Sequence, residues 1–248
     1  MQLHNKVAVV YGAAGAIGGA VARAFASEGA TVFRTGRSST APDVAEVDAL
    51  DERAVDEHLR SVVDQAGRVD ISFNAIGIPD AEILGVPFVD LDVERFAEPI
   101  RDYTTSYFLT ARLAARHMIR SGSGVIMTVS AVPARTGTPL NGGYGPAQAA
   151  REALTRDLSM EFAPHGIRVV ALRPHGLPET STMHELFDAK RKGAMTWEEF
   201  EAFLAASSHP RRLQRLEEVA NAAVLVASDG ASGLTGTTVN LTMGTTSD

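Results

Sequence analysis

Cysteine is absent from this sequence of 248 residues. Its absence excludes disulfide bonds and any chemistry that depends on a thiolate. Histidine, aspartate and glutamate are present, but no group of them has the spacing of a metal-ligand set. We therefore expect no metal site.

Long hydrophobic runs and an excess of positive charge are also lacking. No apolar run is long enough to span a bilayer, and the first residues, MQLHNK, lack the apolar core of a signal peptide. The formal net charge of −7 argues against a surface for nucleic acid or anionic membranes. We therefore expect a soluble cytoplasmic protein without nucleic-acid or membrane partners. A chain of this length fits one large α/β domain.

What is present is organised around residues 7–18, VAVVYGAAGAIG. Four apolar residues predict a buried strand, glycines follow at Gly12, Gly15 and Gly18, and residues 20–25 continue at helical spacing. Such a turn directs backbone N–H groups and a helix N-terminus at one point, where a pyrophosphate can bind. Glycine is needed where the backbone bends sharply or approaches the ligand closely. The plainer interpretation is a tight turn without a ligand.

Strands and helices alternate along the rest of the chain. Apolar runs predict further strands at residues 30–34, 44–47, 70–73, 125–129, 167–172 and 238–241. Helical spacing predicts helices at 51–65, 96–119, 146–162 and 217–226, and the second of these has core candidates at Phe108, Leu109, Leu113 and Met118. This order predicts a single-domain α/β fold, a Rossmann-type doubly wound parallel sheet, with its ligand site at the carboxyl ends of the strands. We expect four residues to converge there: Asn74, Ser130, Tyr144 and Pro174.

The end of the second predicted strand carries no acid. Folds that prefer NAD usually place an acidic residue there to bind the ribose 2′-hydroxyl. Here Thr35, Gly36 and Arg37 follow the strand, which leaves room for a 2′-phosphate and provides charge to meet it. The alternative is that Arg34 and Arg37 are solvated surface residues. The pattern favours NADP(H) over NAD(H).

Motifs spread over nearly the whole chain resemble those of the short-chain dehydrogenase/reductase family. YGAAGAIG is similar to the family's TGxxx(G/A)xG turn, FNAIG at residues 73–77 to its NNAG motif, and RPHG at 173–176 to the PG turn near the nicotinamide. Asp48 matches the acid that contacts the adenine, and Tyr144 begins a match to YxxxK. The resemblance implies an NAD(P)-dependent oxidoreductase. With Arg37 added from the strand end, the predicted cofactor-binding residues are Gly12, Ala14, Gly15, Ile17, Gly18, Arg37, Asp48, Asn74, Ala75, Ile76, Gly77, Tyr144, Gln148, Pro174 and Gly176.

The catalytic positions depart from the family pattern. The family's tyrosine exchanges a proton with the substrate, and a lysine four residues later lowers its pKa and binds the nicotinamide ribose. Here Tyr144 is followed at that spacing by Gln148, which can hydrogen-bond a ribose hydroxyl but carries no charge. The family serine falls at Ala131, one residue after Ser130, and the family asparagine falls at Tyr103. The predicted catalytic set is Tyr144, Ser130 and Gln148; the plainer interpretations are a strand-end cap for Ser130 and a pocket wall for Tyr144.

A missing ammonium has a calculable cost. A free tyrosine has a pKa near 10, whereas proton transfer is most efficient near the operating pH, so the loss slows the step by roughly ten- to a thousandfold if nothing compensates. The candidate replacements are His175, Arg173, Arg135 and Arg151. His175 is the most attractive because it lies in the nicotinamide turn and titrates near neutrality; the plainer interpretation is a solvated turn residue. Arg151 lies seven residues after Tyr144, on nearly the same helix face but about 10 Å farther along the axis.

Residues 177–210 lie where the family has its substrate loop. They carry many apolar side chains: Met183, Leu186, Phe187, Met195, Trp197, Phe200, Phe203 and Leu204. We expect either a lid that closes over a largely apolar small-molecule substrate or ordinary packing of one or two short helices. The resemblance also implies a homo-oligomer, a tetramer or dimer, joined through the helices at 96–119 and 146–162.

Three functions are consistent with the sequence. The first is an NADP(H)-dependent oxidoreductase that acts on a carbonyl/alcohol pair, with Tyr144 as the proton donor or acceptor. The second, motivated by the missing lysine, is a nucleotide-binding sensor or partner protein with little redox activity. The third is a non-redox dehydratase or isomerase that uses the same crevice. The fold alone cannot choose between them, because function depends on the site.

Overall fold

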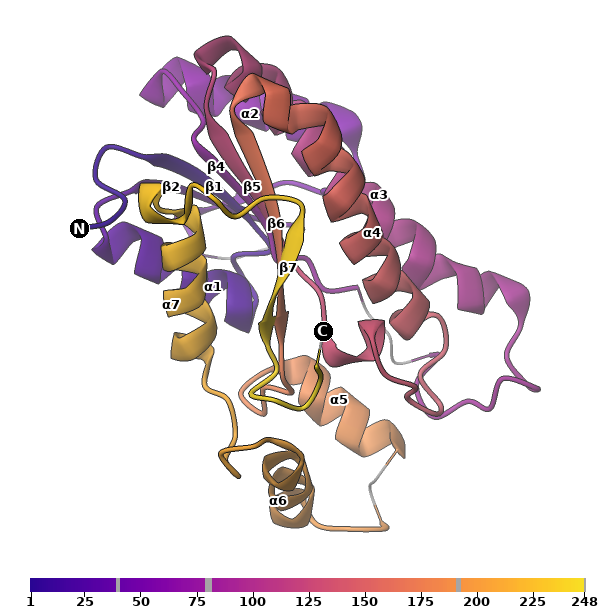
Figure 1. Ribbon diagram of the computed structural model, residues 1–248. Helices are drawn as coiled ribbons and strands as arrows, with labels where there is room; N and C mark the ends of the chain where they lie inside the picture. The colour runs from indigo at the N-terminus through magenta and orange to yellow at the C-terminus, as the bar shows by residue number, and fades with distance from the viewer. Residues whose placement is uncertain (39–40, 79–81, 191–192, 248) are drawn as a thin grey trace.

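A parallel sheet forms the centre of the molecule. The computed structural model describes residues 1–38, 41–78, 82–190 and 193–247, and within them seven strands pair in the order β3-β2-β1-β4-β5-β6-β7 (Figure 1). Every neighbouring pair is parallel. The strands are β1 (Val7–Tyr11), β2 (Thr31–Gly36), β3 (Val44–Glu46), β4 (Ile71–Asn74), β5 (Gly124–Val129), β6 (Ile167–Pro174) and β7 (Thr237–Leu241). The predicted Rossmann-type doubly wound sheet is confirmed.

Helices cover both faces of this sheet. The described helices are α1 (Ala16–Ser27), α2 (Glu52–Ala66), α3 (Val93–Ser121), α4 (Tyr144–Phe162), α5 (Ser181–Lys190), α6 (Trp197–Ser207) and α7 (Leu216–Ala227). Helices α1 and α7 lie side by side on one face, and α3 and α4 lie side by side on the other (Figure 1). Helices α5 and α6 follow β6 and lie beyond the end of the sheet (Figure 1).

Two apolar cores result, one on each face. In β1, Val7, Val9 and Tyr11 pack with the core under α2, α3 and α4, whereas Ala8 and Val10 pack with the core under α1 and α7. Successive side chains of a strand point to opposite faces, so a strand covered on both sides is apolar throughout. This is why the first strand is apolar along its length, with the Tyr11 hydroxyl as its one polar side-chain group.

Phe108 corrects the predicted core. Leu109, Leu113 and Met118 of α3 are buried as expected, but Phe108 is 41% exposed. It precedes Leu109 by one residue and is therefore turned about 100° away from the buried stripe. Its ring instead packs under the Arg112 guanidinium, whose carbon lies 5.3 Å from the ring centroid.

Two helices begin earlier than the sequence pattern predicts. Helix α3 begins at Val93 because Asp92 caps it, with its carboxylate accepting a hydrogen bond from the Arg95 N–H at 2.9 Å. Helix α4 begins at Tyr144, so Pro146 lies in its first turn, where the absent N–H has no helical partner to lose. The second shift places Tyr144 at the first position of the helix.

Candidate functional site

The glycine turn between β1 and α1 has no room for side chains. Gly12 has a φ of 76°, and a Cβ there would lie 2.6 Å from the Ala75 carbonyl oxygen at the end of β4. A Cβ on Gly18 would collide with the Gly12 carbonyl. The Ala13 N–H donates to the Thr35 carbonyl at 2.8 Å. The turn therefore lies directly against the carboxyl ends of both strands that flank β1.

Helix α1 presents an uncapped N-terminus at this turn. Its N-cap residue is Gly15, no side chain caps it, and its first turn contains no acid. Ala14 and Gly15 are exposed, and Ile17 is half-buried. Free N–H groups and the positive end of the helix dipole suit a phosphate group. The residues present at this turn therefore fit a dinucleotide pyrophosphate.

Two arginines lie at the end of β2, and their contacts differ. Arg34 forms an ion pair with Asp43, and its guanidinium also reaches the Ala13 carbonyl at 3.5 Å. Arg37 is exposed and makes no ion pair with any residue that the structure describes. Asp48 is half-buried and accepts a hydrogen bond from the Leu50 N–H at 2.9 Å. Among the described residues, Arg34 is therefore held by partners at this strand end, whereas Arg37 is not.

Tyr144 lies at the first position of α4 and is half-buried. Its ring packs edge-on against that of Tyr103 in α3, with centroids 5.8 Å apart and an interplanar angle of 78°. The Tyr103 hydroxyl accepts a hydrogen bond from the Ile78 N–H at 3.1 Å, which joins α3 to the segment after β4. Tyr103, at the family's asparagine position, therefore connects Tyr144 to Ile78 after β4 through its phenol ring.

Arg151 occupies the interior between α4, β4 and β5. Its side chain is 2% exposed, and its Nη2 donates to the Asn74 carbonyl at 3.3 Å, to Asn74 Oδ1 at 3.2 Å and to the Thr128 hydroxyl. Its Nη1 donates to Gln148 Oε1 at 3.4 Å. Burial lowers the pKa of the guanidinium, and the nearby phenols, including those of Tyr103 and Tyr144, raise it in part. An arginine stays charged despite such a shift, because its ordinary pKa is above 12.

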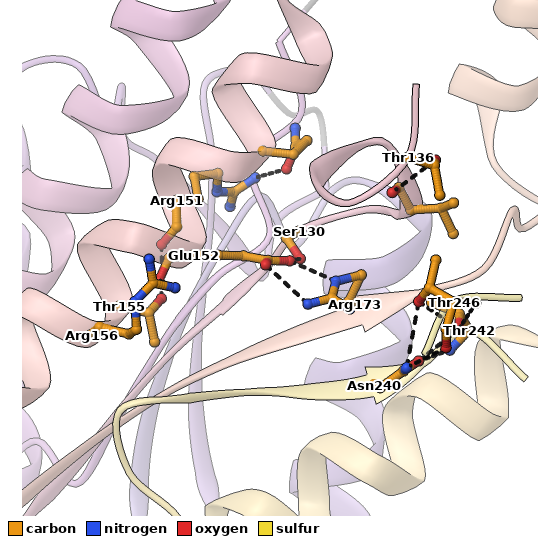
Figure 2. A network of polar contacts seen from close by, with 12 residues as sticks. Ser130, Thr136, Arg151, Glu152, Thr155, Arg156, Arg173, Asn240, Thr242 and Thr246 are labelled. Atoms are coloured by element: carbon orange, nitrogen blue, oxygen red, sulfur yellow. Dashed lines mark hydrogen bonds and ion pairs between the residues drawn. The ribbon is translucent and has the colours of Figure 1, made fainter. Parts of the chain in front are cut away.

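Ser130, Glu152 and Arg173 form a second buried group. Arg173 Nε and Nη2 donate to the two carboxylate oxygens of Glu152 at 2.7 and 3.0 Å, and Ser130 Oγ donates to Glu152 Oε1 at 2.7 Å. Figure 2 shows the side chains of Ser130, Glu152 and Arg173 pointing toward one another. The predicted catalytic role of Ser130 is therefore in competition with a structural one, because a substrate carbonyl needs the same proton. Arg173, a candidate replacement charge, is neutralised here by Glu152.

His175 joins the turn after β6 to the end of α6 and to the segment that follows it. Its Nε2 lies 2.9 Å from Ser207 Oγ, and its N–H donates to Gln214 Oε1 at 2.8 Å. Burial lowers the pKa of the imidazole, so its neutral form is favoured at pH 7. A neutral, buried histidine does not replace a permanent positive charge. Pro174, beside it, ends β6 and is buried.

Helices α5 and α6 pack against this turn and against each other. Met183 and Leu204 approach Gly176, where an added Cβ would lie 3.3 Å and 3.5 Å from their side chains. The Trp197 ring stacks on His184 at 4.1 Å and meets Phe187 and Phe200 at 5.3 and 5.6 Å between centroids. Part of the apolar content of residues 177–210 is thus used in internal packing. Residues 191–192 of this segment lie outside the described residues.

A lysine connects α5 to the loop before Tyr144. Lys190 Nζ donates to the Pro139 carbonyl at 2.9 Å and to Asn141 Oδ1 at 2.7 Å. Asn141 is buried, and its own carbonyl accepts the Tyr144 N–H at 3.1 Å. The predicted lid segment therefore contacts the loop that leads into α4.

Glu152 is a site residue that the sequence analysis missed. The buried positions of α4 recur at helical spacing back from Phe162: Leu158, Ser159, Thr155, Glu152, Arg151, Gln148 and Ala147. That spacing is a signal visible in the sequence, because it assigns five polar residues to the buried face. The spacing does not predict which side chains these residues contact.

The described residues contain no group of three or more histidine, cysteine, aspartate or glutamate side chains arranged to bind a metal ion. Among the described helices, none combines the length and the apolar character needed to cross a membrane.

Comparisons with known proteins agree with this geometry. Residues 12–246 match the protein family described as Enoyl-(Acyl carrier protein) reductase. The chain is 33% identical over 245 residues to cis-4-hydroxycyclohexanecarboxylate dehydrogenase of Sinomonas cyclohexanicum, covering 94% of this chain and 93% of that one. It is 28% identical over 258 residues to the 3-oxoacyl-(acyl-carrier-protein) reductase FabG of Escherichia coli (strain K12), covering 98% of each.

Solved structures show the same fold. NAD⁺-bound xylitol dehydrogenase superposes with a TM-score of 0.90 at 24% identity, covering 98% of this chain and all of that one. A 7α-hydroxysteroid dehydrogenase in complex with NADH and 7-oxo glycochenodeoxycholic acid superposes with a TM-score of 0.85 at 25% identity, covering 98% and 95%. The fold of this chain is therefore shared over nearly its whole length with these two dehydrogenases.

Proposed function

The chain belongs to the short-chain dehydrogenase/reductase family, and we propose that it is an NADP(H)-dependent oxidoreductase that interconverts a carbonyl compound and an alcohol. The observation that carries the proposal is the convergence of three features at one edge of the sheet. These are the glycine turn with the open N-terminus of α1, the segment after β4 that it touches, and Tyr144 at the start of α4.

The chain has residues for each part of such a cofactor. The N-terminus of α1 with Gly12, Ala14, Gly15, Ile17 and Gly18 would bind the pyrophosphate, and Asp48 would bind the adenine. Arg37 would meet a 2′-phosphate, which an acid at this strand end would repel. Asn74, Ala75, Ile76 and Gly77, together with Gln148, Pro174 and Gly176, would line the ribose and nicotinamide region. When bound, the cofactor supplies or accepts the hydride.

Tyr144 is the group that we assign to the proton. In the reducing direction its phenol donates to the carbonyl oxygen as that oxygen gains negative charge, and in the oxidising direction its phenolate accepts the proton of the alcohol. We assign the hydrogen bond to the substrate oxygen to Tyr144 as well, because the Ser130 hydroxyl donates to Glu152. Helices α5 and α6 carry the apolar side chains that would exclude water from a largely apolar substrate.

Two measurements test the proposal. Titration with NADPH and NADH, followed by nicotinamide fluorescence, is expected to show binding of both with a preference for NADPH. A panel of ketones and aldehydes, followed by the loss of NADPH absorbance, is expected to show turnover that Tyr144→Phe reduces by at least about a hundredfold. Absence of binding to either nucleotide would rule out the proposed function.

The second candidate is a nucleotide-binding protein without redox turnover. The buried Ser130–Glu152 hydrogen bond and the uncharged Gln148 favour it, because each removes a group that would assist catalysis. Tight binding of NADPH with no turnover across the panel would support this candidate against the first. Turnover of a substrate without consumption of the nucleotide would support a dehydratase or isomerase instead.

We further propose a homo-oligomer, a dimer or tetramer, that is built on α3 and α4. These helices present Phe108, 41% exposed, and Met160, 83% exposed, on their outer faces. Large apolar side chains that are exposed on a single chain are common in surfaces that a second subunit covers.

A further inference from the structure

We propose that Arg151 and Gln148 divide between them the two tasks of a single ammonium group: Arg151 supplies the positive charge that makes Tyr144 acidic, and Gln148 supplies the hydrogen-bond donor at the ribose. The inference rests on the proposed function, because it concerns the proton that Tyr144 would exchange. It accounts for a site whose lysine position holds an uncharged side chain.

The charge of Arg151 has no opposite charge beside it. Among the described residues, its guanidinium donates hydrogen bonds only to neutral oxygens. These are the Asn74 carbonyl and side chain, the Thr128 hydroxyl and Gln148 Oε1. Its chain neighbour Glu152 points to Arg173 instead, and both members of that pair are buried. Burying a guanidinium without a partner carboxylate costs desolvation free energy. A buried arginine without such a partner is therefore unusual, and we infer that its charge acts on another group.

The groups on which it can act are tyrosines. The Arg151 guanidinium carbon lies 5.2 Å from the centroid of the Tyr103 ring, and that ring contacts the Tyr144 ring. The phenols of Tyr103, Tyr144 and Tyr107 all interact electrostatically with the guanidinium. A positive charge favours the ionised phenolate, and an opposite charge within about 4–6 Å lowers a tyrosine pKa by roughly one to three units.

Other charged groups around Tyr144 do not cancel this effect. The Glu152–Arg173 pair faces the end of β5 and is neutral as a unit, and burial favours the neutral form of His175. Arg135, on the exposed loop after β5, carries the same sign as Arg151. In α3, Tyr107 hydrogen-bonds Thr155, and burial raises its pKa to about 12.

The contact with Arg151 also fixes the Gln148 amide. A guanidinium only donates hydrogen bonds, so the amide atom that meets it at 3.4 Å must be Oε1. The two N–H bonds of Nε2 are consequently directed away from Arg151. Gln148 lies one helical turn after Tyr144, so its donor faces the same region as the phenol. Donor and charge thus come from residues three positions apart on one helix.

The chain is well suited to a direct test, because it contains only four tyrosines. Burial raises the pKa of Tyr11 above the ordinary range, and that of Tyr107 to about 12. Any tyrosine that ionises below the ordinary pKa of about 10 is therefore Tyr103 or Tyr144. A pH titration of tyrosinate absorbance in the protein without nucleotide, repeated on Tyr144→Phe and Tyr103→Phe, identifies which one.

We expect one tyrosine to ionise at least about one unit below the ordinary value and to disappear in Tyr144→Phe. Arg151→Met should raise that pKa by about one unit or more, and Arg151→Lys should preserve most of the depression. Arg156→Met, the same change at an exposed position of α4, should leave it unchanged. Gln148→Met should also leave it unchanged, but should weaken NADPH binding by about tenfold through the lost hydrogen bond.

The inference is overturned if no tyrosine of the wild-type protein ionises below the ordinary value, or if the low pKa belongs to Tyr103. Titration of the wild-type protein and of the two tyrosine variants decides this, even where Arg151→Met does not fold. Turnover of the carbonyl panel without a depressed pKa would refute the inference and leave the proposed function standing. A depressed pKa controlled by Arg151 in a protein without turnover would refute the proposed function and support the inference.

Discussion

Neutralising Glu152 should destabilise the protein strongly, because it leaves a buried cation behind. Glu152 and Arg173 have side chains 4% and 1% exposed, and they share two hydrogen bonds of 2.7 and 3.0 Å. Removing one partner of such a pair costs about 3–5 kcal/mol in the free energy of unfolding. For a domain of this size each kcal/mol lowers Tm by about 2–4 °C, so Glu152→Gln should lower Tm by roughly 6–20 °C.

Urea denaturation followed by circular dichroism measures the effect, and a matched substitution controls for it. Glu57→Gln removes the same charge from an exposed i,i+4 pair with Arg53, where the nitrogen–oxygen distance is 3.7 Å, and should cost at most about 0.5 kcal/mol. Combining Glu152→Leu with Arg173→Met should recover most of the lost stability, because no unpaired charge remains. A loss below about 1 kcal/mol for Glu152→Gln would refute the reasoning, since the pair would then be no stronger than a surface one.

Three further predictions follow from other parts of the structure. Arg37→Asp should shift the ratio of NADPH to NADH affinity by at least about tenfold toward NADH, measured by fluorescence titration, whereas an unchanged ratio would exclude Arg37 from 2′-phosphate binding. Met160→Glu should reduce the molar mass found by light scattering, whereas an unchanged oligomer would place the interface elsewhere. The Glu218 pKa is lowered to about 2, chiefly by its hydrogen bond from Arg212, so the carboxylate stabilises the fold above its unfolded pKa of about 4 and less as pH falls toward 2. Glu218→Gln should therefore cost under about 1 kcal/mol at pH 7, because solvent screens the pair, and a stability difference that does not shrink with acid would contradict this origin.

The sequence predicts those parts of the fold that depend on local pattern. Burial on both faces requires apolar residues in a strand such as residues 7–10. Close backbone contacts require glycine at Gly12 and Gly18. Both requirements can be recognised from the residue types alone. Phe108 was predicted to lie in the core because hydrophobicity alone does not report the rotation of a long helix, and one position of rotation separates it from Leu109.

The candidate site was less predictable, because its contacts join residues that are far apart in the chain. Arg173 could be named as a possible charge, but its neutralisation by Glu152 depends on how β6 and α4 pack. Arg151 reaches Asn74, which is 77 positions away, and no spacing rule connects the two. The catalytic roles of Ser130, Tyr144 and Gln148 stay predictions, and the structure adds to them the partners that each side chain has.

The bonds of Lys190 to Pro139 and Asn141 tie α5 to the loop that leads into α4. If α5 swings outward to admit a bulky molecule, either these two bonds break or the 139–141 segment is pulled along with it. In the second case the start of α4, where Asn141 holds the Tyr144 N–H, shifts as well. A large substrate would then be disfavoured in two ways: by steric hindrance at α5 and by displacement of the Tyr144 phenol from its position.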